Sequence, residues 1–161
     1  MVLAVFAGLP GVGKSTLAQQ VGAALPAAVL AVDTVDIALR AYDVTEPRPG
    51  FAAYGVVAAL AEAQLRLGHS VIIDAVNPVR PARQLWTDLA DRLDVPVRVV
   101  EVVCGDDTEH RRRAEHRHDW GYVLERQAEY EPYVGPRLVV DTHLADEPVK
   151  PILDYLNLRT S

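Results

Sequence analysis

The sequence predicts an α/β fold of three layers, in which a five-stranded parallel sheet carries helices on both faces. Five short apolar runs alternate along the 161 residues with longer segments of helical character. The runs are continuously apolar, as expected for strands buried on both faces, and their alternation with helices is typical of a parallel sheet. Hydrophobic residues make up 50% of the chain, enough for the core of a single domain that spans residues 1–161.

The first half of the chain predicts three strands and three helices. A glycine-rich turn separates the first strand from the first helix, which ends before Pro26 because a residue that precedes proline disfavours helical angles. A loop rich in proline, TEPRPG, separates the next two helices, and Gly68 closes the second of them. In order, we expect a strand at 2–7, a helix at 14–25, a strand at 27–32, helices at 34–42 and 51–67, and a strand at 70–74.

The second half continues the alternation with two strands and three helical segments. Asn77 and Pro78 form a turn, and Pro81 suits the first turn of a helix, where its missing N–H is not needed. We expect a helix from 81 to about 93, a strand at 95–104, a helical segment at 107–130 with a break near Gly121, a strand at 137–142 and a helix at 147–156.

Charge and composition narrow the function classes. The formal net charge is −6, whereas nucleic-acid-binding proteins usually show a broad basic face, so the composition argues against a nucleic-acid partner. The single cysteine, Cys104, excludes an internal disulfide framework and fits a reducing, cytoplasmic location, and we interpret it as a small core residue. No targeting segment or membrane span is expected, because even the apolar stretch 51–67 contains Glu62 and Arg66.

The stretch GLPGVGKST, residues 8–16, carries the strongest functional signal. It satisfies the pattern G-x-x-x-x-G-K-[ST] between a strand and a helix, a position that favours a phosphate-binding loop over a glycine turn with a chance lysine. Its N–H groups can form an anion-binding nest at a helix N-terminus, Lys14 can reach the β- and γ-phosphates, and Ser15 can bind Mg²⁺. The residues expected to bind the nucleotide are Gly8, Gly11, Val12, Gly13, Lys14, Ser15 and Thr16.

Two aspartates follow the second and third expected strands. Asp33 comes directly after the second strand, and Asp74 ends the third. Ligands of open parallel sheets bind outside the carboxyl ends of the strands, so both acids should lie near the glycine-rich loop. Asp74 fits a Mg²⁺ site together with Ser15, whereas Asp33 fits either a catalytic role or the N-cap of the next helix.

A basic cluster, TEHRRRAEHR, occupies residues 108–117. Arg113 and Arg117 are four residues apart, which would place them on one helix face, and guanidinium groups stabilise the charge that phosphoryl transfer spreads over oxygen atoms. The alternative is a solvated face paired with Glu109 and Glu115. Three histidines are interpreted as exposed helix residues rather than metal ligands: His110, His116 and His118.

Four stretches occur in the order found in small P-loop kinases: GLPGVGKST, VDTVDIALR (32–40), VIIDAVN (71–77) and TEHRRRAEHR. The chain therefore resembles this group, which includes the kinase module of polynucleotide 5′-kinases, gluconate-type kinases and antibiotic phosphotransferases that modify a hydroxyl. It is most similar to the polynucleotide-kinase-like branch of AAA-type small ATP-binding proteins. The resemblance covers residues 2–118 and implies a P-loop NTPase fold with a helical lid at about 107–135.

The resemblance also implies residue roles. Asp33 matches the acid that accepts the proton from the acceptor hydroxyl. Arg113 and Arg117 match the paired lid arginines that clamp the phosphates. Asp74 and Asn77 match the acid and the amide that lie near the metal and the phosphates.

Together these features predict an ATP-dependent kinase that acts on a hydroxyl of a small molecule, with ATP and Mg²⁺ as cofactors. Polynucleotide kinases place an arginine three residues after the general base, and Asp36 at that position argues against a nucleic-acid acceptor. A nucleoside or polynucleotide kinase and a non-enzymatic ATP-binding switch remain alternatives. Asp36 and Arg40 form either a surface pair or part of the acceptor site. We expect a monomer or homodimer with no membrane association. The candidates for acceptor contacts are Arg40, Tyr42, Arg48 and Tyr54, and the alternative for each is a packing or surface residue.

Overall fold

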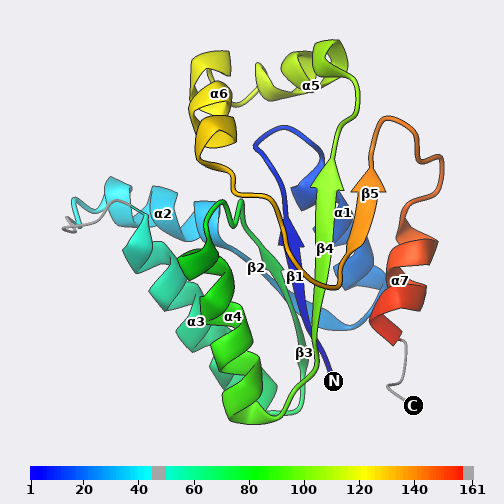
Figure 1. Ribbon diagram of the computed structural model, residues 1–161. Helices are drawn as coiled ribbons and strands as arrows, with labels where there is room; N and C mark the ends of the chain where they lie inside the picture. The colour runs from blue at the N-terminus through cyan, green and yellow to red at the C-terminus, as the bar shows by residue number, and fades with distance from the viewer. Residues whose placement is uncertain (45–49, 158–161) are drawn as a thin grey trace.

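A five-stranded sheet, with all strands parallel and in the order β2-β3-β1-β4-β5, forms the centre of the computed structural model (Figure 1). The structure describes residues 1–44 and 50–157. The strands are β1 (Leu3–Ala7), β2 (Ala27–Ala31), β3 (Ser70–Asp74), β4 (Val97–Val103) and β5 (Leu138–Asp141). All five predicted strands are therefore confirmed. β3 has the predicted bounds, and the other four are somewhat shorter than their apolar runs.

The register of the sheet aligns the ends of three neighbouring strands. Phe6 of β1 lies opposite Asp74 of β3, and Asp74 lies opposite Ala31 of β2. Every residue of β1 is buried, because this strand is central in the sheet. The segments that follow β1, β2 and β3 therefore begin side by side at one edge of the sheet.

Helices cover both faces of the sheet, as predicted. On one face, α3 (Phe51–Arg66) and α4 (Arg80–Leu93) pack against β1 and β3, with α2 (Val32–Ala41) beside α3. On the other face, α1 (Lys14–Ala24) and α7 (Val149–Asn157) pack against residues of β1, β3 and β4 (Figure 1). Within the described parts of the chain, no helix combines the length and the apolar character needed to cross a membrane.

The remaining helices, α5 (Asp107–Ala114) and α6 (Trp120–Glu129), lie beyond the carboxyl ends of the strands, where the predicted lid was expected (Figure 1). The predicted break in this helical segment is confirmed, but it lies at residues 115–119, just before Gly121, which is in the first turn of α6. The extended backbone of Asp119 starts the new helix.

The loop after β3 is held by Asn77, which is fully buried and has a positive φ of 52°. Its side-chain oxygen accepts a hydrogen bond of 2.7 Å from the Trp86 indole, and its Nδ2 donates to the carbonyls of Phe6 and Ala75. The backbone N–H of Asn77 donates to the Tyr54 hydroxyl. The polar atoms of its side chain therefore bind the protein interior, and the implied position of this amide near the metal and the phosphates stays a prediction.

Asn77→Ala is expected to lower the free energy of unfolding by about 2–4 kcal/mol, because it leaves the buried Trp86 N–H without an acceptor and puts an alanine at positive φ. Urea-induced unfolding measures this loss. The matched control is Asp94→Ala, which also has a φ of 52° but is exposed. A loss for Asn77→Ala no larger than that for Asp94→Ala would show that the side-chain hydrogen bonds of Asn77 contribute nothing.

Candidate functional site

The glycine-rich loop joins β1 to α1 and takes the backbone conformation of an anion nest. Gly11 and Gly13 have φ angles of 84° and 96°, in the left-handed region that disfavours residues with a Cβ. A Cβ on Gly11 would also lie 2.7 Å from the backbone of Ala114, so the loop can pass beneath α5 only with glycine there. The two glycines flank Val12, which packs into the core beside α1.

The N-terminus of α1 opens directly into this loop. Gly13 is the N-cap residue and no side chain caps the helix, while the first hydrogen bond to the cap runs from the Leu17 N–H to the Gly13 carbonyl. The amides of Lys14, Ser15 and Thr16 therefore point out of the helix end, where they can donate to an anion.

Lys14 and Asp74 form a buried ion pair at the centre of the site. The lysine is 5% exposed and the aspartate 6% exposed, and Nζ lies 3.4 Å from Oδ1. The Asp74 Oδ1 atom is buried and has no hydrogen-bond donor among the described residues. A long ion pair with an incompletely bonded carboxylate leaves both groups available to a further charged ligand, since buried charges are stable only when well paired.

Asp33 is exposed and lines a cavity of about 520 Å³. Asp33 is the second residue of α2, whose N-cap is Ala31 and which no side chain caps. Asp33 is therefore not the N-cap of α2, and that alternative is wrong. The cavity lies between α2, α3, α4 and α6, and its polar lining residues are Asp33, Asp36, Arg40, Tyr54, Tyr122, Arg126 and Glu129.

Two ion pairs line the cavity. The Arg40 Nε donates to Asp36 Oδ2 at 2.9 Å, and Arg126 binds Glu129 with both terminal nitrogens at 3.1 Å. Asp36 and Arg40 thus form the predicted pair and also face the cavity. Burial, together with the negative charge of Asp33, raises the pKa of Tyr54 to about 12.

Of the other acceptor candidates, Tyr42 is 84% exposed and does not line the cavity. Arg48 lies outside the described residues.

The two lid arginines do not share a helix face. Arg113 lies in α5, where its Nε donates to Glu109 at 2.6 Å and its Nη1 to the Thr142 hydroxyl at 2.9 Å. Arg117 lies after the end of α5, in the exposed turn that leads to α6, because the helix is shorter than its basic sequence suggested. Hydrogen bonds from Arg112 and Arg113 lower the pKa of Glu109 to about 2.

Thr142, which sequence reasoning did not select, links Arg113 to the glycine-rich loop. It follows β5, and its hydroxyl lies 2.7 Å from the Val12 carbonyl as well as accepting from Arg113. Its side-chain methyl group would lie 3.3 Å from a Cβ on Gly13. The only signal in the sequence is a hydroxyl residue directly after an apolar strand.

His110 anchors α5 on the glycine-rich loop. The interpretation of this histidine as exposed is wrong, since it is 5% exposed and its Nε2 lies 2.8 Å from the Pro10 carbonyl. A carbonyl oxygen only accepts hydrogen bonds, so Nε2 is the donor. The His110 ring also meets the Trp120 ring edge-on, with centroids 5.2 Å apart. His116 is exposed, as predicted.

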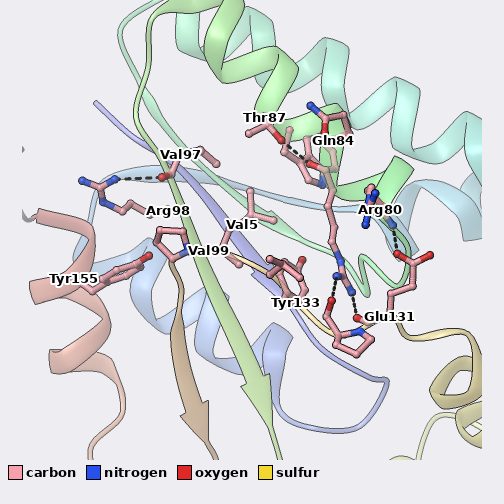
Figure 2. A pocket seen from close by; sticks show the side chains of 15 residues that line it. Val5, Arg80, Gln84, Thr87, Val97, Arg98, Val99, Glu131, Tyr133 and Tyr155 are labelled. Carbon is pink, nitrogen blue, oxygen red and sulfur yellow. Dashed lines mark hydrogen bonds between the residues drawn. The ribbon is translucent and has the colours of Figure 1, made fainter.

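A second cavity, of about 570 Å³, lies between α4 and β4 (Figure 2). Thr87 and Gln84 of α4, Val97 and Val99 of β4, and Tyr133 line it. Its β4 residues belong to the amino-terminal part of that strand, away from the glycine-rich loop, so this cavity is separate from the candidate site.

The segment 131–134 lines the second cavity and is held by Arg83. The Arg83 guanidinium donates to the carbonyls of Asn77, Pro78, Glu131 and Pro132. Its Cζ also lies 3.6 Å from the centre of the Tyr133 ring. Arg83 therefore ties the end of the lid to the loop after β3.

Comparisons with known proteins agree with this geometry. The family described as AAA domain matches residues 3–129. A gluconokinase from Sinorhizobium meliloti 1021 has a similar structure, with a TM-score of 0.75 and 16% identity over 96% of this chain and 91% of that chain. Kti12 from Chaetomium thermophilum, in complex with ADP-AlF3, gives a TM-score of 0.74 and 19% identity over 96% of this chain and 98% of that chain.

The Mycobacterium tuberculosis APS kinase CysC, in complex with AMPPNP and APS, gives a TM-score of 0.72 and 22% identity over 98% of each chain. No curated protein sequence matches this chain. The structural likenesses confirm the predicted P-loop NTPase-like α/β fold, which this chain shares with kinases.

His110→Phe is expected to destabilise the protein by about 1–3 kcal/mol, because the ring is retained but the buried Pro10 carbonyl loses its donor. ATP binding should weaken in the same variant, since the loop that follows Pro10 loses its support from α5. Urea-induced unfolding and isothermal titration with MgATP measure the two effects.

His116→Phe is the matched control, because it makes the same replacement at an exposed position just beyond the same helix. Its unfolding free energy should change by less than about 0.5 kcal/mol. Equal losses of stability and of ATP affinity in the two variants would contradict the anchoring role of His110.

Proposed function

This chain belongs to the AAA domain family, and from that premise we propose that it is an ATP-dependent kinase that transfers the γ-phosphoryl group to a hydroxyl of a small molecule. The observation that carries the proposal is the juxtaposition of the phosphate-binding loop with the Asp33 cavity. Val76 lines this cavity, and its carbonyl accepts a hydrogen bond from the Gly8 N–H at the start of the loop. An acceptor in the cavity would therefore lie beside a nucleotide on the loop.

The loop amides and Lys14 would bind the nucleotide phosphates. The amides of residues 14–16 already point out of the α1 N-terminus. Lys14 would exchange its 3.4 Å contact with Asp74 for contacts with phosphate oxygens, which bring a larger negative charge.

Ser15 and Asp74 are the residues that would hold Mg²⁺. The fit rests on the Asp74 Oδ1 atom, a buried carboxylate oxygen without a hydrogen-bond donor among the described residues, which is the kind of ligand that a hard cation prefers. When bound, the ion supplies positive charge to the phosphate oxygens.

Asp33 would act as the general base. Its carboxylate would take the proton of the acceptor hydroxyl while the acceptor oxygen forms its bond to the γ-phosphorus. The bond from the γ-phosphorus to the bridging oxygen breaks in the same displacement, and ADP leaves with that electron pair. Exposure of Asp33 in the cavity lining keeps the carboxylate accessible to such a hydroxyl.

Arg113 and Arg117 would stabilise the charge on the transferred group. Arg113 is oriented by Glu109 and Thr142 beside the glycine-rich loop. The Arg117 side chain has no hydrogen bond or ion pair with any residue in the described part of the chain and lies in the turn between α5 and α6. A small movement of that turn would bring a second guanidinium toward the phosphates.

The central test compares Asp33→Asn with Lys14→Ala. ADP release would be measured with glycerol, gluconate, adenosine and a 5′-hydroxyl oligonucleotide as acceptors. We expect Asp33→Asn to lower the acceptor-dependent rate by about 10²–10⁴-fold while MgATP binding is retained. Lys14→Ala should lose both the acceptor-dependent rate and MgATP binding, because it removes a charge that binds the phosphates.

Asp91→Asn, on the exposed side of α4, is the matched control for Asp33→Asn and should leave the rate unchanged. ATP hydrolysis that ignores added alcohols and survives Asp33→Asn would refute the kinase and favour a non-enzymatic ATP-binding switch. Transfer to the oligonucleotide alone would favour the polynucleotide kinase.

Arg113→Ala is expected to lower kcat by about 10²-fold, with a smaller change in KM for ATP, because the guanidinium acts mainly on charge that develops during transfer. Arg112→Ala is the matched control, since Arg112 is adjacent, also pairs with Glu109 and is exposed. Steady-state kinetics with varied ATP separates the two parameters. A rise in KM with unchanged kcat in Arg113→Ala would assign this residue to ground-state binding instead.

A further inference from the structure

The cavity beside Asp33 has a charge and a surface that restrict its ligand. Resting on the proposed function, we propose that the acceptor is an uncharged or cationic alcohol with an apolar or aromatic body, and that the cavity selects against anionic acceptors. The inference follows from three properties of the cavity: its apolar wall, its charge balance and its unused hydrogen-bond donor.

A large part of the cavity lining is apolar. The apolar residues come from the loop after β3 and from α2, α3 and α4. These residues are Val32, Phe51, Tyr54, Val76, Pro78, Val79, Pro81, Ala82 and Leu85. A cavity of about 520 Å³ with this wall fits a drug-sized apolar body, whereas a polyol would leave its hydroxyl groups without partners there.

Among the described residues, the charged groups that line the cavity sum to one negative charge. The described lining contains the carboxylates of Asp33, Asp36 and Glu129 and the guanidinium groups of Arg40 and Arg126. Both guanidinium groups are already paired, Arg40 with Asp36 and Arg126 with Glu129. A carboxylate or phosphate on the acceptor would therefore find no unpaired cation in this lining, and a nucleotide on the adjacent loop would add further repulsion.

Arg126 provides a donor suited to a neutral oxygen. Its Nε atom is buried and has no hydrogen-bond partner among the described residues, while its terminal nitrogens bind Glu129. An ether, carbonyl or hydroxyl oxygen of the acceptor would satisfy this donor without adding charge.

Two tyrosines provide aromatic surface without adding charge. Tyr54 and Tyr122 line the cavity from α3 and α6. Burial raises the pKa of both hydroxyls, that of Tyr54 to about 12, so both stay neutral at physiological pH. The Tyr122 ring is already stacked with His118, with centroids 5.5 Å apart, and the Arg126 Cζ lies over it at 5.4 Å. Tyr54 is therefore the tyrosine whose ring would contact an aromatic ligand.

The test uses three alcohols that share a hydroxymethylbenzene core and carry a neutral, cationic or anionic para substituent: 1,4-benzenedimethanol, 4-(aminomethyl)benzyl alcohol and 4-(hydroxymethyl)benzoate. Saturation-transfer NMR titration of the full chain without nucleotide would give the dissociation constant of each. We expect the neutral and cationic alcohols to bind about 5-fold or more tightly than the benzoate. Equal or tighter binding of the benzoate, or no saturation transfer to any of the three, would overturn the proposal.

A charge-altered cavity tests the cause of the selection. The double variant Asp36→Asn with Glu129→Gln leaves Arg40 and Arg126 unpaired and changes the net charge of the lining from negative to positive. The benzoate should then bind at least as tightly as the cationic alcohol, so that the order reverses. Asp88→Asn with Asp91→Asn adds the same charge on the exposed side of α4 and should leave the original order intact.

An unchanged order in the double variant would overturn the charge argument. Since the titrations contain no ATP, they are independent of the kinase assay. Selective binding without phosphoryl transfer would refute the kinase and leave the proposed selectivity of the cavity standing. Transfer to anionic acceptors would support the kinase and overturn the proposed selectivity.

Discussion

The in-register parallel pairing of β1, β2 and β3 is the constraint on which the candidate site depends. Phe6, Asp74 and Ala31 lie opposite one another across three strands. The glycine-rich loop, the Asp74 carboxylate and the start of α2 therefore meet at one edge without any long connection. Parallel strands can do this because each crossover helix returns the chain to the same end of the sheet. A slip of one residue in β3 would turn Asp74 to the opposite face and separate it from Lys14.

The pattern of apolar runs was sufficient to predict the sheet and its flanking helices. Strands buried on both faces must be apolar throughout, so their positions are visible in the sequence. The phosphate-binding loop was equally visible, because its glycines and Lys14 follow from the geometry that an anion nest requires. Asp74 could be placed beside Lys14 from strand ends alone, and the ion pair between them agrees with that placement.

Contacts between distant segments could not be predicted in the same way. The sequence around His110 predicts a charged, exposed helix, and the packing of α5 on Pro10 buries the histidine. Asn77 matches a motif position that implies an amide near the phosphates, but its side-chain oxygen accepts a hydrogen bond from the buried Trp86 indole. Thr142 reaches the Val12 carbonyl because β5 lies next to β4 in the sheet. The order of the strands along the chain does not reveal this neighbour.

The lid is tied to the body of the protein at both ends. His110 joins its beginning to the glycine-rich loop, and Arg83 holds its last residues against α4. These two attachments fix α5 and the segment after α6 to different parts of the protein. The five residues 115–119, which include Arg117, lie between these two attachments and outside both helices, so any change in the angle between α5 and α6 would have to arise there.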